Sequence, residues 1–215
     1  MKKLLAATAV SALFAGVAQA EDVKLGIIYG FTGPIESLTG SMAAASEAAI
    51  DEVNASGLFL DGAKVSSVRA DSTCIDAAAA TAAAERLVTS DKVNGILGGD
   101  CSGVTGAILS NVAVPNGIVM ISPSATSPAL STVDDKGLFF RTAPSDAREG
   151  EIAADIMTER GIKTAALTYS NSDYGKGLAE AIQKAFEAKG GKITISAAHE
   201  DGKADYSAEV ASLAS

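Results

Sequence analysis

The sequence lacks the residues on which several classes of functional site depend. It has no tryptophan, one histidine, two cysteines and only 5% aromatic residues. One histidine and two distant cysteines do not make a cluster with metal-ligand spacing, so we expect no metal site. Neither the dinucleotide-binding glycine pattern nor a P-loop is present, and no cofactor of another kind is indicated. The formal net charge is −9 without a lysine- and arginine-rich block, which excludes the basic surface typical of nucleic-acid binding.

The first 20 residues have the pattern of an export signal. Two lysines precede an apolar run, Leu4–Val17, which is followed by the small-residue site Ala18-Gln19-Ala20. The run is shorter than the ~20 residues that span a bilayer core, so a retained membrane anchor is the weaker alternative. We therefore predict a signal peptide over 1–20, cleavage after Ala20 and a periplasmic mature protein.

Cys74 and Cys101 are the two cysteines of a chain sent to an oxidising compartment, where an even count predicts a disulfide. A rival interpretation starts from Gly99-Asp100-Cys101-Ser102-Gly103, which fits the nucleophile elbow of α/β-hydrolases with cysteine as the nucleophile. Such an enzyme needs a histidine base, and the one histidine, His199, is expected to be an exposed residue at the end of a strand. A cysteine held in a disulfide is no nucleophile, so the hydrolase is the weaker alternative.

Along the mature chain, short β-branched or apolar runs alternate with longer alanine-rich stretches of helical period. This alternation predicts an α/β fold in which a parallel sheet is flanked by helices. The predicted strands of the first part are 23–29, 65–70, 93–97, 117–122 and 138–142. The predicted helices between them are 38–54, which Gly57 ends, a helix from the N-cap Asp76 through Leu87, and 102–112.

The βα rhythm restarts near Pro144, where Ser145 is expected to be the N-cap of a new helix. The predicted strands beyond it are 163–169 and 192–197. We therefore expect a first, ligand-binding lobe over 21–143 and a second lobe over 144–215. Because the second part has two strands and stops inside a predicted helix, we expect an incomplete second lobe in a truncated chain.

Loops at the carboxyl ends of the predicted strands form the candidate ligand site, because open parallel sheets bind ligands at this edge. Ser102 is predicted at the start of a helix, whose free N–H groups favour a carboxylate. Ser124 and Thr126 add hydroxyl groups from the next loop. An equally weighted alternative is that Ser102, Thr105 and Thr126 only cap helices. Tyr174 follows a strand of the second lobe, where it either closes over a ligand or is a plain surface residue.

Four segments, in order along the chain, carry a family resemblance. They are Val23–Pro34 with its Thr-Gly-Pro turn, the pair Cys74 and Cys101-Ser102, the stretch Ile121-Ser122-Pro123-Ser124-Ala125-Thr126, and Asp173-Tyr174-Gly175-Lys176-Gly177. Together they resemble the branched-chain amino acid-binding proteins, of the Leu/Ile/Val-binding type, of ABC importers, over essentially all of the mature chain. The resemblance implies a type I periplasmic binding fold with two lobes, hinge strands and a ligand in the cleft. It also implies the disulfide between the two cysteines.

The resemblance assigns roles to the candidate site residues. Ser102 holds a ligand carboxylate through its N–H and hydroxyl groups, assisted by Ser124 and Thr126. Thr126 and the carbonyl group of Ser124 also reach a ligand ammonium, with Ala125 between them in the same binding loop. Tyr174 covers the ligand from the second lobe.

Two features keep the ligand class open. Leu38 stands where amino acid-binding members often place an aromatic side chain, and the acidic partner of the ammonium group is expected beyond Ser215. Because similar proteins also carry amides and aromatic acids, the expected ligand is an amino acid, an amide or a small organic acid.

We expect a passive receptor and not an enzyme, so no catalytic residue is predicted. The receptor captures its ligand in an open cleft, closes by hinge motion near Thr142–Ser145, and presents the closed form to an ABC permease of the inner membrane. The alternative is a sensor domain of the same fold that acts on a signalling partner. A monomer is expected, with no nucleic-acid partner.

Overall fold

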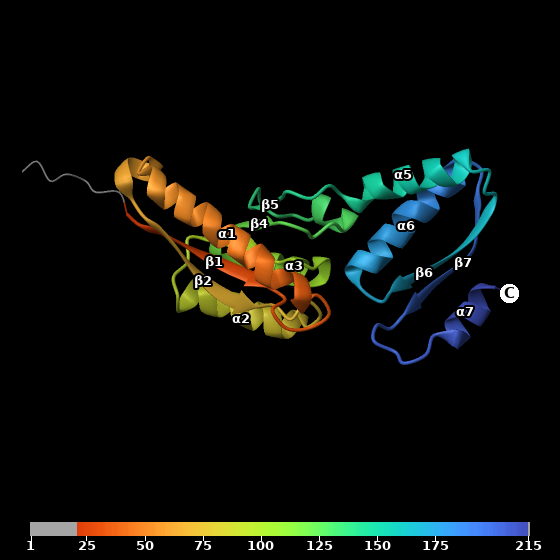
Figure 1. The fold of residues 1–215 in the computed structure, drawn as a ribbon, viewed down its shortest axis with the longest axis horizontal. Helices are drawn as coiled ribbons and strands as arrows, with labels where there is room; N and C mark the ends of the chain where they lie inside the picture. Colours follow the sequence, from red (N-terminus) through yellow and green to blue (C-terminus); the bar gives the residue numbers. More distant parts are fainter. Residues whose placement is uncertain (1–20, 215) are drawn as a thin grey trace, which may run out of the picture.

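The computed structural model describes residues 21–214, which form two α/β lobes (Figure 1). The strands of the first lobe are β1 Val23–Tyr29, β2 Val65–Asp71, β3 Gly95–Gly98, β4 Val119–Ser122 and β5 Phe139–Arg141. Its helices are α1 Glu36–Ser56, α2 Ala77–Thr89, α3 Ser102–Ile108 and α4 Val114–Asn116, with short helical segments η1 Phe59–Gly62, η2 Leu109–Ala113 and η3 Pro128–Ser131. The second lobe contains α5 Asp146–Glu159, β6 Thr164–Ser170, α6 Asp173–Ala188, β7 Lys192–His199 and α7 Ser207–Leu213. The predicted signal peptide lies outside the described residues.

The sheets of both lobes are parallel. The first has the order β2-β1-β3-β4-β5, and the second consists of β6 and β7. The predicted α/β class, with parallel sheets flanked by helices, is therefore confirmed. None of the helices in 21–214 is both long and apolar enough to cross a membrane.

Both faces of strand β1 are covered. Ile28 belongs to the core formed with α2 and α3, whereas Ile27 and Tyr29 belong to the core formed with α1. Both isoleucines are fully buried. A nearly continuous apolar run is typical of a parallel strand that is buried on two faces, which explains why this segment was readable from sequence.

The predicted helix ends are formed by the expected residues. Asp76 precedes α2, and its carboxylate accepts hydrogen bonds from the N–H groups of Ala78 and Ala79. Ser145 precedes α5 and accepts from the N–H group of Ala147. Gly57 ends α1 with φ of 65°, in the left-handed region that glycine adopts without strain.

Several boundaries in the first lobe differ from the prediction, and two of the differences have a cause in the structure. The strand expected at 93–97 begins at Gly95, because the N–H group of Val93 donates to Leu87 at the end of α2, and the side chain of Asn94 accepts from the N–H group of Lys24. The helix expected to end at 112 continues as the π-helical segment η2 and then as α4, up to the left-handed Gly117.

The second lobe is built on the packing of α5 against α6, which Figure 1 shows running side by side. Gly150 permits this contact, since a Cβ atom at this position would lie 2.6 Å from the carbonyl carbon of Ala181. Neither β6 nor β7 has a fully buried residue. The predicted lobe boundary after residue 143 falls in the segment that joins β5 to α5.

Candidate functional site

The disulfide joins two loops at the carboxyl edge of the first sheet. Cys74, after β2, and Cys101, after β3, are bonded, with their Cα atoms 5.3 Å apart. The predicted disulfide is therefore present, and the structure contradicts the cysteine-hydrolase alternative because Cys101 has no free thiol. His199 is in the second lobe, at the end of β7. It is half-buried rather than exposed, with Nδ1 2.7 Å from the Thr168 hydroxyl and its ring edge-on to Tyr206.

Ser102 is the first residue of α3 and is buried. Its hydroxyl oxygen accepts a hydrogen bond of 3.1 Å from the N–H group of Ser127 in the loop after β4. The N-cap position belongs to Cys101, and no side chain caps α3. The alternative interpretation of Ser102 as a helix cap is therefore wrong, and its backbone N–H group lies at the uncapped first turn of the helix.

The loop 123–127 contains the other three predicted residues of the first lobe. Ser124 is exposed, and its hydroxyl donates to the carbonyl oxygen of Asp100 at 2.8 Å. Ala125 is fully buried; its N–H group donates to the Ser122 hydroxyl, and its carbonyl oxygen accepts from Arg141. Of the three, Ser124 has the most exposed side chain.

Thr126 is bonded to Asp146, whose buried carboxylate was not predicted from the sequence. Its carbonyl oxygen accepts from the N–H group of Asp146, the first residue of α5, at 3.0 Å. The Asp146 side chain is only 1% exposed, and within 21–214 its Oδ2 atom has no hydrogen-bond partner. Burial raises the pKa of Asp146, while the hydrogen bond with the Thr126 hydroxyl and the positive charge of Arg141 act in the opposite direction.

Arg141 and Tyr174 complete the surroundings of Asp146. The Arg141 guanidinium donates to the carbonyl oxygens of Ala125 and Ser127, which fixes the loop before it. Burial raises the pKa of Tyr174, and the negative charges of Asp146 and then Glu149 raise it further, so this tyrosine lies within electrostatic reach of the buried carboxylate. Ser102 is bonded to Ser127, which follows Thr126 in the chain, Thr126 is bonded to Asp146, and the charge of Asp146 acts on Tyr174.

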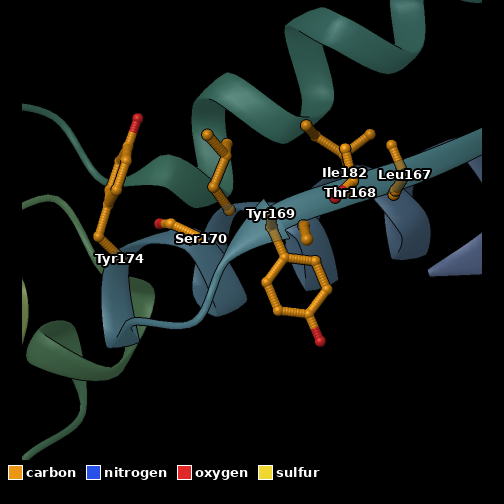
Figure 2. Close-up of a pocket in the computed structure, with 9 residues that line it drawn as sticks. Leu167, Thr168, Tyr169, Ser170, Tyr174 and Ile182 are labelled. Carbon is orange, nitrogen blue, oxygen red and sulfur yellow. The ribbon is translucent and has the colours of Figure 1, made fainter. Parts of the chain in front are cut away.

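A cavity of about 160 Å³ lies behind Tyr174 in the second lobe, between β6 and α6. Its lining is mostly apolar, and Tyr174 is the only predicted ligand-binding residue among its lining residues. Figure 2 shows Tyr174 at the start of α6 with its hydroxyl directed away from β6, whereas Tyr169 points to the opposite side of the strand. We therefore place the candidate site on the loops of the first lobe and not in this cavity.

The family model described as periplasmic binding protein matches residues 22–215. The chain belongs to the periplasmic binding protein family. This membership confirms the resemblance seen in the sequence, and homologous members of the family are periplasmic.

Curated relatives of this periplasmic binding protein bind amino acids, as their names state. The Leu/Ile/Val-binding protein of Escherichia coli strain K12 is 30% identical over 212 residues, which cover 98% of this chain and 56% of the relative. The leucine-, isoleucine-, valine-, threonine- and alanine-binding protein of Pseudomonas aeruginosa is 29% identical over 214 residues, with 99% and 56% covered. The chain thus spans somewhat more than half the length of the curated relatives it matches.

Solved structures confirm the fold of this periplasmic binding protein. The branched-chain amino acid transporter substrate-binding protein LivJ of Streptococcus pneumoniae, in complex with isoleucine, matches with a TM-score of 0.77 and 28% identity, over 90% of this chain and 54% of that one. A solute-binding protein of an ABC transporter from R. palustris, in complex with 4-hydroxybenzoate, has a TM-score of 0.78 at 21% identity, over 90% and 51%. The second likeness shows the fold alone.

Proposed function

We propose that this protein is the substrate-binding component of an ABC importer and that it binds an amino acid, or a similar small carboxylate or amide, between its lobes. The ligand leaves unchanged, so the protein is a receptor and not an enzyme. Family membership and the names of the relatives support the general role. The buried carboxylate of Asp146 supports the ligand class.

Asp146 is the single observation that carries the proposal. A buried carboxylate oxygen without a partner is costly, because it has lost its hydration and gained no hydrogen bond in return. Such an orphaned acceptor in a region that two lobes share is well suited to an ammonium group. Asp146 then takes the role that we first expected of a residue beyond Ser215, and Thr126 supplies the second oxygen.

The carboxylate of the ligand goes to Ser102, in this proposal. The N–H group of Ser102 lies at the uncapped start of α3, where the partial positive charge of a helix favours an anion. Ser124 belongs to the same region, where its hydroxyl donates to the carbonyl oxygen of Asp100, and its own carbonyl group reaches the ligand ammonium in this proposal. Asp146 begins α5 and is bonded to the loop after β4, so it lies beside the segment 142–145 at which we propose the hinge motion. Tyr174 then covers the ligand from the second lobe.

The remaining parts of the proposal concern processing and partners. The signal peptide 1–20 is cleaved after Ala20, and the mature protein acts in the periplasm as a monomer. Lobe one spans 21–143, and lobe two begins at 144. The closed form docks on an ABC permease of the inner membrane.

Three ligands of one shape test the proposal on the protein at its full natural length. L-leucine carries both charged groups, leucinamide lacks the carboxylate, and 4-methylpentanoate lacks the ammonium. We expect calorimetry to give at least about a tenfold weaker affinity for each of the two analogues, because each loses charge-assisted hydrogen bonds worth about 1.5–3 kcal/mol. Equal binding of 4-methylpentanoate and L-leucine would contradict the role of Asp146.

A further inference from the structure

Asp100 is a second buried carboxylate, and the predicted set of ligand-binding residues does not include it. It lies between β3 and α3, and its side chain is 3% exposed. Its Oδ2 atom accepts from the N–H group of Gly30 at 2.7 Å. Its Oδ1 atom accepts from the Ser72 hydroxyl at 3.3 Å and from the N–H group of Cys101 at 3.1 Å.

The Asp100 carboxylate and backbone carbonyl group together connect the four loops that follow β1, β2, β3 and β4. Gly30 follows β1, Ser72 follows β2, and Asp100 itself follows β3. The carbonyl oxygen of Asp100 accepts from the hydroxyl of Ser124, which follows β4. One residue therefore connects loops that are far apart in the sequence, whereas the disulfide joins only the second loop to the third.

The loops around Asp100 are packed so closely that a shift of the first loop would move the loop that contains Cys74. A Cβ atom at Gly30 would lie 3.0 Å from the Cβ atom of Cys74 and 3.2 Å from its backbone nitrogen. The first loop therefore packs against the disulfide-bonded Cys74 and is also hydrogen-bonded to Asp100. If the carboxylate released Gly30, the first loop would lose its only hydrogen bond to the third loop among those found in 21–214.

We propose that Asp100 is a positioning residue that holds the four loops in register and thereby sets the places of Ser102 and Ser124. All three partners of its side chain are donors, which suits an ionised carboxylate with its two acceptor oxygens. Asparagine at this position would turn an N–H donor toward one of these donors. The inference rests on the proposed function only where ligand affinity is concerned; the link between the loops stands without it.

The first test measures amide hydrogen exchange by NMR in this chain. In Asp100→Asn we expect the amides of Gly30 and Cys101 to exchange at least about tenfold faster, because each loses a charge-assisted hydrogen bond. The amide of Ile28, inside the sheet, should keep its rate. Asp134→Asn is the matched control, since it removes an exposed carboxylate of the same lobe. Ser72→Ala, which keeps the charge and removes one donor, should give a smaller change, and it serves if the first variant does not fold.

The second test measures L-leucine affinity by calorimetry, well below the unfolding temperature, on the protein at its full natural length. We expect Asp100→Asn to weaken binding by about tenfold or more, Ser72→Ala to weaken it less, and Asp134→Asn to leave it unchanged. Unchanged exchange at Gly30 and Cys101 would overturn the inference. Faster exchange with unchanged affinity would overturn it too, because Asp100 would then be structural only. If the wild-type protein binds none of the proposed ligands, the proposed function fails by itself, and the exchange experiment still decides whether Asp100 holds the loops.

Discussion

The two lobes contain the same unit in very different surroundings. In the first lobe, β1, α1 and β2 form a parallel strand-helix-strand unit, and in the second lobe β6, α6 and β7 form another. Strand β1 is paired on both edges and buries Ile27 and Ile28 completely. Within the described residues, β6 is paired on one edge only and has no fully buried residue. The strand-helix-strand pattern thus determines the unit, whereas its neighbours determine how deeply it is buried.

Because of this difference, we expect the parts of the candidate site on the two lobes to differ in mobility. Parallel sheets are normally covered on both faces, and the first lobe meets that condition with helices on either side (Figure 1). Segments with few buried apolar contacts open at lower free energy than core segments. We therefore expect the first-lobe part of the site, with Ser102 and Thr126, to be rigid, and the second-lobe part, with Tyr174, to be more mobile.

Matched core truncations should give the largest difference between the lobes. Ile28→Ala removes a fully buried side chain of β1, and we expect it to lower the free energy of unfolding by about 4 kcal/mol. Leu167→Ala removes a half-buried side chain of β6. This change should lower the free energy of unfolding by about 1 kcal/mol, because the Leu167 side chain buries less apolar surface than that of Ile28. Urea unfolding followed by circular dichroism measures both. Equal losses would break the comparison, since burial would then not decide the stability of the two units.

Asp146, at the junction of the lobes, should show opposite effects on stability and on binding. Burial raises its native pKa, so the native state binds more protons than the unfolded state, and this carboxylate lowers the free energy of unfolding as the pH rises. Asp146→Asn should therefore be more stable than the wild type at pH 7. The gain should shrink as the pH falls through the raised native pKa toward the unfolded value of about 3.9, where the wild type is protonated as well. Thermal unfolding between pH 3 and pH 7 measures this difference.

The same variant should bind L-leucine about tenfold more weakly, because the ammonium group loses a charged acceptor. Glu159→Gln is the control, since it neutralises an exposed carboxylate of the same helix. A variant that loses stability at neutral pH would mean that Asp146 is a structural residue. In that case Asp146 would stabilise the fold, as the buried residues of the first lobe do.

Sequence predicted best those features that depend on neighbours along the chain. Asp76 and Ser145 are N-caps because a short oxygen-bearing side chain reaches the N–H groups two or three residues ahead, and Gly57 ends a helix because it adopts positive φ freely. The continuation of α3 was missed because Pro115 argues against a helix. The π-helical segment precedes this proline and departs from the i to i−4 bonding that the proline would interrupt.

The candidate site was predicted only in part, for a related reason. Ser102 and Thr126 follow strands, so the rule for the carboxyl edge of a parallel sheet found them. Asp100 and Asp146 also follow strands, but an acidic residue near a helix start is usually a solvated one. Both are buried where they are bonded to the loops of other strands, Asp100 to those after β1, β2 and β4 and Asp146 to that after β4, and nothing in the local sequence reports this.

The contact between the lobes allows the finest test, through two helical glycines. A Cβ atom at Gly177 in α6 would lie 2.9 Å from the ring atom Cδ of Pro128 and 3.1 Å from the Ser127 hydroxyl, whereas one at Gly40 in α1 would meet nothing within 4 Å. Replacing a helical glycine by alanine stabilises by about 1 kcal/mol, because the unfolded chain loses freedom. Gly40→Ala should show this gain in urea unfolding. Gly177→Ala should lose it, because the methyl group forces α6 away from η3, and small-angle X-ray scattering should show a larger radius of gyration. Equal gains with unchanged scattering would mean that the lobes do not meet at Gly177 in solution.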